Sequence, residues 1–204
     1  MLYELATLAI RLGTAAKAVA GIDSYVKDPA AKGRLLGCWA SEIGELNRLI
    51  VLRGFADAAE LAAERSRTLG TTNPFHCGEA LSHLRLESYA PFSFLPPVAP
   101  GAFGGVYEIR TYALKLGGVG PTSAAWEAAM PERAKLSPLT IAMYALDGPQ
   151  RFTHIWPYAS LDARAAVRAE SVAKGVWPPK GGPDWLTGDM QSTIGLPTAI
   201  SPLA

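Results

Sequence analysis

The sequence predicts an α+β protein built from two tandem ferredoxin-like units, each with the order strand–helix–strand–strand–helix–strand. The first observation is a repeat: Leu2-Tyr3-Glu4-Leu5 returns as Val106-Tyr107-Glu108-Ile109, and Leu12-Gly13 returns as Leu116-Gly117, at a constant offset of 104 residues. The second is the stretch Val106–Leu114, whose side chains alternate with period two, as in a half-buried strand. A chain of 204 residues can hold two units of about 100 residues, each able to close a core.

The first unit spans residues 1–90. Its expected strands are Leu2–Ile10, Gly33–Ser41, Glu45–Arg53 and Ala80–Tyr89, and its expected helices are Ala15–Val26 and Ala58–Thr68. Thr14 and Asp57 precede the two helices, and their side-chain oxygens can accept hydrogen bonds from the free N–H groups of a first turn. Pro29 ends the first helix, because the residue before a proline disfavours the helical region.

A linker at residues 91–105 carries four prolines and three glycines and leads to the second unit, residues 106–204. The expected strands of that unit are Val106–Leu114, Leu139–Leu146, Gln150–Pro157 and Asp189–Leu196, and its expected helices are Pro121–Arg133 and Leu161–Lys174, the latter capped by Ser160. The remaining segment, Gly175–Gly188, is rich in Pro and Gly. A connection of this length favours a functional or interfacial loop, and we expect it over the mouth of a pocket.

Composition excludes several classes of partner. The net charge is +1 and no Lys/Arg cluster occurs, which argues against nucleic acid. No apolar run reaches the roughly 18 residues of a membrane span. The N-terminal Met1-Leu2-Tyr3-Glu4 lacks the basic region of a signal peptide, so we expect a cytoplasmic protein. The apolar content of 49% leaves surplus surface for contact between the units or for a homodimer.

No metal or cofactor site is predicted. Cys38 lies in an apolar strand-like run and is expected to be a buried free thiol. His76 and Cys77 are adjacent, so they would point to opposite faces of a strand, and His83 has no second ligand nearby in the sequence. Signatures of nucleophilic triads and phosphate loops are absent as well.

Candidate site residues come from two strands of the second unit. On the first, Glu108, Arg110 and Tyr112 share one face; on the third, one face carries Phe152, His154, Trp156 and Tyr158. If Ile155 packs under the helices, both sets face the interior between the sheets. His154 is then the candidate general base, because histidine moves protons near neutral pH.

A small-molecule pocket is mostly apolar with a few convergent polar groups. Here it would be completed by Glu108, Arg110, Tyr112, Trp156 and Tyr158. Arg110 and Tyr112 are the candidate catalytic partners that stabilise an oxyanion. Glu108, Trp156 and Tyr158 are candidates for substrate binding.

A structural interpretation stays open beside the catalytic one. Glu108 and Arg110 lie two apart on one strand face and can form an interior ion pair. His154 can be a hydrogen-bonded interior histidine, and Trp156 and Tyr158 can be core aromatics that bury large areas without any ligand.

Two landmarks of the second unit resemble the NIPSNAP family. One is Tyr107-Glu108-Ile109-Arg110-Thr111-Tyr112 with Leu114-Lys115-Leu116-Gly117, and the other is His154-Ile155-Trp156-Pro157-Tyr158 followed by Ser160-Leu161. The resemblance implies the dimeric α/β-barrel fold, here formed within one chain. It implies no settled activity, since the wider superfamily includes cofactor-free monooxygenases, dehydratases, isomerases and haem enzymes.

The first unit resembles a degenerate copy. Val51, Arg53 and Phe55 stand where the second unit has His154, Trp156 and Tyr158, and Ala6 stands in place of Arg110. This loss favours a single pocket in the second unit.

Two functions remain open. One is a protein that binds or transforms a small organic molecule by acid/base chemistry in the second unit. The alternative is a non-catalytic interaction protein whose barrel is filled by its own side chains and whose segment Trp177–Trp185 offers an aromatic surface to a partner. We expect the space between the sheets to distinguish these two functions: an open space favours the small-molecule site, and a filled one favours the interaction protein.

Overall fold

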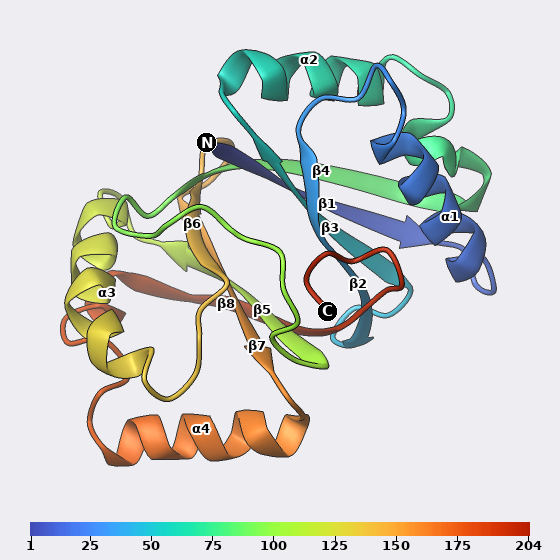
Figure 1. The fold of residues 1–204 in the computed structure, drawn as a ribbon. Coiled ribbons are helices and arrows are strands. Elements are labelled where there is room, and N and C mark those ends of the chain that lie inside the picture. Colours follow the sequence, from blue (N-terminus) through green and yellow to red (C-terminus); the bar gives the residue numbers. More distant parts are fainter.

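The computed structural model describes all residues 1–204 and contains the two expected βαββαβ units (Figure 1). The first unit consists of β1 (Leu2–Ile10), α1 (Ala15–Val26), β2 (Arg34–Ile43), β3 (Arg48–Phe55), α2 (Ala58–Leu69) and β4 (Leu81–Pro91). The second unit consists of β5 (Val106–Leu114), α3 (Val119–Arg133), β6 (Ile141–Ala145), β7 (Arg151–Tyr158), α4 (Leu161–Ala173) and β8 (Leu186–Pro197). Three short 3-10 turns at Pro74–His76, Gly78–Ala80 and Pro183–Trp185 complete the chain.

The eight strands form one closed antiparallel barrel in the order β1-β3-β2-β8-β5-β7-β6-β4. Each unit therefore contributes four neighbouring strands. The two seams between the units are β2 with β8, where Trp39 lies opposite Pro197, and β4 with β6, where Tyr89 lies opposite Ala145. Because the sheet closes, no strand edge of either unit is left unpaired. The α+β fold with two ferredoxin-like units forming a pseudo-dimer is confirmed.

Side chains from both units fill the inside of the barrel. Fourteen buried apolar residues form this cluster, including Tyr3, Trp39, Tyr107, Ile109 and Ile155. The rings of Trp39 and Tyr107 lie 5.2 Å apart across the seam. The lumen is therefore a core that holds the two units together.

The segment between the units closes one end of this core. Val98 and Leu203 both belong to the lumen cluster. The Val98 N–H donates a hydrogen bond to the Tyr3 hydroxyl at 3.1 Å, and Gly101 pairs with Leu203 in a short parallel bridge. The linker and the C-terminal tail thus cover the barrel together, near the centre of Figure 1.

The helices lie outside the barrel, with α1 and α2 over the first unit and α3 and α4 over the second (Figure 1). A second core of 13 residues lies under α1 and α2, and a third of eight residues lies under α3 and α4. Asp57 and Ser160 cap α2 and α4 as predicted, accepting hydrogen bonds from the backbone N–H groups of Glu60 and Ala163. Thr14 is the N-cap residue of α1 as predicted, but its side chain makes no capping hydrogen bond, and its hydroxyl donates to the Arg11 carbonyl at 2.7 Å.

The faces of β5 and β7 that were predicted to face the barrel lumen lie under the helices, and the opposite faces line the lumen. Tyr107, Ile109 and Ile155 face the lumen, while Trp156 packs in the core under α3 and α4. His154 lies on the same face of β7 as Trp156. The alternation along β5 and β7 is correct, but both faces of a barrel strand with covering helices are buried. Alternation alone therefore cannot tell the lumen from the helix side.

Candidate functional site

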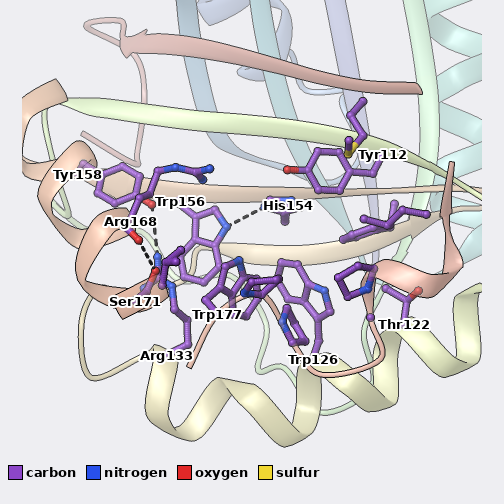
Figure 2. A pocket seen from close by; sticks show the side chains of 18 residues that line it. Tyr112, Thr122, Trp126, Arg133, His154, Trp156, Tyr158, Arg168, Ser171 and Trp177 are labelled. Atoms are coloured by element: carbon purple, nitrogen blue, oxygen red, sulfur yellow. Dashed lines mark hydrogen bonds between the residues drawn. The ribbon is translucent and has the colours of Figure 1, made fainter. Parts of the chain in front are cut away.

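A cavity of about 280 Å³ lies between the sheet of the second unit and its helices (Figure 2). Its floor is β7, its walls are α3 and α4, and its remaining side is the loop of residues 174–185 that joins α4 to β8. Apolar side chains fill the centre of the barrel lumen, beside which a small hollow of about 60 Å³ lined by Leu5, Ile50 and Ile109 among others remains. The 280 Å³ cavity lies outside the barrel, and all its lining residues belong to the second unit.

Aromatic rings form most of the apolar wall. Trp126 of α3 contacts Trp177 of the 174–185 loop edge to face, with ring centroids 4.7 Å apart. The Trp126 ring also lies 5.5 Å from Phe152 and 6.1 Å from Trp156, both on β7. Edge-to-face aromatic packing is favourable and rigid, so it holds this wall open without a ligand.

Helical spacing explains the contribution of α3. Trp126, Met130 and Arg133 are buried and stand four and three residues apart, which places them on one face of the helix. The chain thereby buries an arginine beside aromatic rings, and the guanidinium of Arg133 lies 4.2 Å from the centre of the Trp156 ring. Sequence reasoning missed Arg133; an arginine on the apolar face of an expected helix was the available signal.

His154 is held in one tautomer by its neighbour. The Trp156 indole N–H donates a hydrogen bond to His154 Nδ1 at 2.7 Å, shown as a dashed line in Figure 2. An indole nitrogen can only donate, so Nδ1 accepts and the proton of the neutral ring lies on Nε2. The His154 side chain is 3% exposed, and its Nε2 has no hydrogen-bond partner.

The surroundings keep His154 uncharged. Burial lowers the pKa of His154 well below 6.5, and the positive charges of Arg110, Arg168 and Arg133 lower it further. A neutral imidazole with its proton on Nε2 donates a hydrogen bond to a ligand at that atom and cannot take a proton there. The general-base role expected for His154 stays a prediction.

Glu108 and Arg110 pair with each other beside the cavity and do not line it. Glu108 Oε1 accepts hydrogen bonds from Arg110 Nη1 at 2.8 Å, from Arg164 Nη2 at 2.5 Å and from Ser192 Oγ at 3.2 Å. Burial raises the pKa of Glu108, but the hydrogen bond from Arg164 and the charges of Arg110 and Arg168 outweigh it, so the pKa is lowered. The geometry fits the interior ion pair that the sequence left open for these two residues.

Four of the six predicted residues do line the cavity: Tyr112, His154, Trp156 and Tyr158. The Tyr112 ring packs edge-on against His154, with centroids 5.1 Å apart. Burial raises the pKa of the Tyr112 hydroxyl, so the phenol is neutral near pH 7. Tyr158 lies at the other end, where its hydroxyl accepts a long hydrogen bond of 3.5 Å from Arg133 Nη2.

Neither a cluster of potential metal ligands nor a membrane-crossing helix is found. No group of three or more His, Cys, Asp or Glu side chains is placed to hold a metal ion. No helix has the length and apolar character needed to cross a membrane. Cys38 and Cys77 are free thiols and both are buried.

Comparison with known proteins agrees with the tandem organisation. The sequence model of the NIPSNAP family matches residues 3–94 and again residues 107–202. A NipSnap homolog of Dictyostelium discoideum is 27% identical over 145 residues, which cover 70% of this chain and 65% of that protein. The chain thus spans somewhat less than two thirds of the length of this relative.

Two solved structures share the whole fold. A putative monooxygenase from Lactobacillus acidophilus superposes with a TM-score of 0.68 at 13% identity, covering 96% of this chain and 93% of that one. An anthrone oxidase-like protein has the same TM-score and identity, covering 100% of this chain and 95% of its own. At this identity the likeness concerns the fold alone. Because the family model matches both βαββαβ units over most of their length, the chain belongs to the NIPSNAP family as a tandem duplicate.

Proposed function

We propose that this protein binds a small organic molecule in the cavity of its second unit. The observation that carries the proposal is His154, which lines an aromatic cavity and has a buried Nε2–H with no partner within the protein. A buried donor without a partner costs about 1–3 kcal/mol, and a ligand oxygen would recover that free energy. At about 280 Å³ the cavity is near the lower end of the usual range for small-molecule sites, so the ligand is small.

The chemistry follows from the donors around the cavity. A carbonyl or phenolic oxygen placed at His154 Nε2 would receive a hydrogen bond from a neutral imidazole. The Tyr112 hydroxyl, on the adjacent strand, would be available to the same oxygen. Fixed donors of this kind favour negative charge that develops on an oxygen, as in an enolate. We propose this electrophilic stabilisation as the role of His154 and Tyr112 in any acid/base reaction at the site.

Two structural neighbours are described as a putative monooxygenase and an anthrone oxidase-like protein. The second description names anthrone, a small organic compound, which is consistent with the proposal. Their identity of 13% supports no transfer of the reaction, and we propose no oxidation.

The interaction protein is the second candidate, and the filled lumen favours it. One observation weakens it: Trp177 packs against Trp126 and Trp156 at the cavity and does not form an open aromatic surface. The filled lumen also leaves the cavity outside the barrel intact, so it does not remove the small-molecule site.

A ligand screen with a matched control tests the proposal. Small acids, phenols and ketones are screened by thermal shift against the wild type, His154→Ala and Val51→Ala. Val51 occupies the position of His154 in the first unit, is fully buried and lines no cavity of the second unit. We expect His154→Ala to unfold cooperatively but to lose the ligand shift, and Val51→Ala to keep it. An unchanged shift in His154→Ala would remove His154 from the site.

A further inference from the structure

We propose that the ligand of this cavity is an organic anion, a carboxylate on a small apolar body, and that Arg133 binds its charged end. This inference rests on the proposed function, since it names the class of molecule that the cavity takes. It starts from a buried cation for which the protein supplies no counter-charge.

Arg133 is 2% exposed and lines the cavity. Its guanidinium donates to the Ser137 hydroxyl at 2.9 Å and, over 3.5 Å, to the Tyr158 hydroxyl, while Nε has no partner. Both partners are neutral, and no carboxylate forms an ion pair with Arg133. Moving an unpaired charge out of water is costly, so buried charges are ordinarily paired.

The first unit shows the same kind of buried arginine with its charge satisfied. Arg53 is 1% exposed and lies between the sheet and the helices, as Arg133 does. It donates to Glu4 Oε1 from Nε at 3.1 Å and to Glu64 Oε1 from Nη1 at 2.6 Å. Two carboxylates thus pair with Arg53, and its guanidinium packs against the rings of Tyr25, Phe55 and Phe75.

The second unit also has no counterpart of Glu64. The helix caps Asp57 and Ser160 are 103 residues apart, and this offset places Val167 at the position of Glu64. Val167 packs against the core under α3 and α4, so no acid replaces Glu64 there. The second unit keeps Glu108, the counterpart of Glu4, as its single buried carboxylate.

Glu108 cannot serve Arg133, because other arginines already engage it. Arg110 and Arg164 donate to Oε1, and Arg168 Nη1 lies 3.5 Å from Oε2. One carboxylate therefore faces three arginines, and Arg133 adds a fourth positive charge. Arg168 also lines the cavity with 41% of its side chain exposed, so it can follow a ligand carboxylate at the entrance. A guanidinium binds a carboxylate with two parallel hydrogen bonds.

The other walls define the rest of the ligand. Trp126, Trp177 and Phe152 line the space next to Arg133 and His154, so the body of the acid must be apolar. The guanidinium of Arg133 lies over the Trp156 ring and 5.8 Å from the Trp177 ring, which fixes its orientation. Figure 2 shows Arg133 beside these rings, with His154 on the far side of Trp156.

Matched acid and amide pairs test the charge at constant shape. The full chain is titrated calorimetrically at pH 7.5 with 2-naphthoate and 2-naphthamide, and with phenylacetate and phenylacetamide. We expect at least one acid to bind about tenfold or more tightly than its amide, since hydrogen bonds to charged groups contribute the most. Arg133→Met is expected to lower affinity for that acid about tenfold or more and to leave affinity for the amide within about twofold.

If Arg133→Met fails to fold, a second pair of variants tests whether the cavity binds a carboxylate. Val167→Glu restores the carboxylate of the first unit, and Val167→Gln is its uncharged control. We expect Val167→Glu to abolish acid binding while Val167→Gln retains it.

The outcomes separate this inference from the proposed function. Equal affinities for acids and amides, lost together in His154→Ala, would overturn the anion and keep the small-molecule site. Acid binding that survives both Arg133→Met and Val167→Glu would overturn the role of Arg133. Failure of every acid and every amide to bind would remove both proposals.

Discussion

The two units of this protein have the same βαββαβ fold but differ in the space between the sheet and the helices. Each unit begins with a buried glutamate on its first strand, Glu4 or Glu108, and each covers its sheet with two helices. In the first unit Arg53 pairs with Glu4 and Glu64. In the second, Trp156 takes the place of Arg53, and a cavity of about 280 Å³ stays open.

The loops before the last strands differ in the same way. In the first unit Phe75 adopts a positive φ of 53°, and its fully buried ring lies 4.8 Å from the guanidinium of Arg53. In the second unit the 174–185 loop places Trp177 in the wall of the cavity, where its ring is only partly buried. The unit whose buried arginine is paired with carboxylates is closed, whereas the unit whose buried arginine has no carboxylate partner keeps an open cavity.

The largest expected effect contrasts the two buried arginines. Arg53→Met leaves Glu4 buried without its main partner and removes one of the two arginines that bind Glu64, and breaking a buried pair in this way costs about 3–5 kcal/mol of unfolding free energy. Arg133→Met leaves no buried carboxylate without a partner, so we expect the free energy of unfolding to stay within about 1 kcal/mol of the wild type. Urea unfolding of both variants measures the contrast. Equal losses would mean that the two arginines play the same structural part.

A smaller effect is the pH dependence that His154 gives to the second unit. The folded protein keeps His154 neutral, whereas the unfolded chain takes up its proton below about pH 6.5. The unfolded state then binds more protons, so the free energy of unfolding falls as pH drops below about 6.5, by up to about 1.4 kcal/mol per pH unit. Above that pH both states are neutral and the effect vanishes.

Urea unfolding between pH 5.5 and 7.5 tests this for the wild type and for His154→Gln. The variant lacks the titrating group and should show a shallower slope. Val51→Ala, which changes the residue at the position of His154 in the first unit and no titrating group, is the control and should keep the wild-type slope. Parallel slopes in all three proteins would contradict the assignment of a neutral buried His154.

The smallest effect concerns the single hydrogen bond that fixes the tautomer. Trp156→Phe removes the indole donor to His154 Nδ1 and is expected to cost about 1 kcal/mol for that bond. Nitrogen-15 NMR of the imidazole should show the Nε2–H tautomer in the wild type and a mixture in the variant. Trp126→Phe is the control, because its ring lies 4.9 Å from His154 without a hydrogen bond to it. A mixed tautomer in the wild type would remove the proposed donor.

The repeat and the periodicities made the fold predictable to a large extent. The offset of 104 residues and the alternation along β5 gave two βαββαβ units, and Asp57 and Ser160 marked two helix starts. Boundaries were less predictable: β8 begins at Leu186, three residues before the expected Asp189, because β-pairing to β5 continues into the loop. The cytoplasmic location and a homodimer stay predictions.

The candidate site was predictable only in part. Tyr112, His154, Trp156 and Tyr158 were found from their alternation, and all four line one cavity. Arg133 was missed because it lies on a helix, where the strand alternation that indicated the other residues does not apply. Its burial without a counter-charge depends on which acids the fold brings near it, and no local pattern contains that information.

By itself the sequence determined the duplicated units, the order of their elements and the pairs of residues that share a strand face, because these follow from local spacing. Only the tertiary structure decided which face looks into the lumen and which lies under the helices. When a sheet is buried on both sides, hydrophobic alternation is nearly symmetric. The side is then set by where charged groups find partners, and for Glu108 those partners include Arg164 and Arg168 on α4.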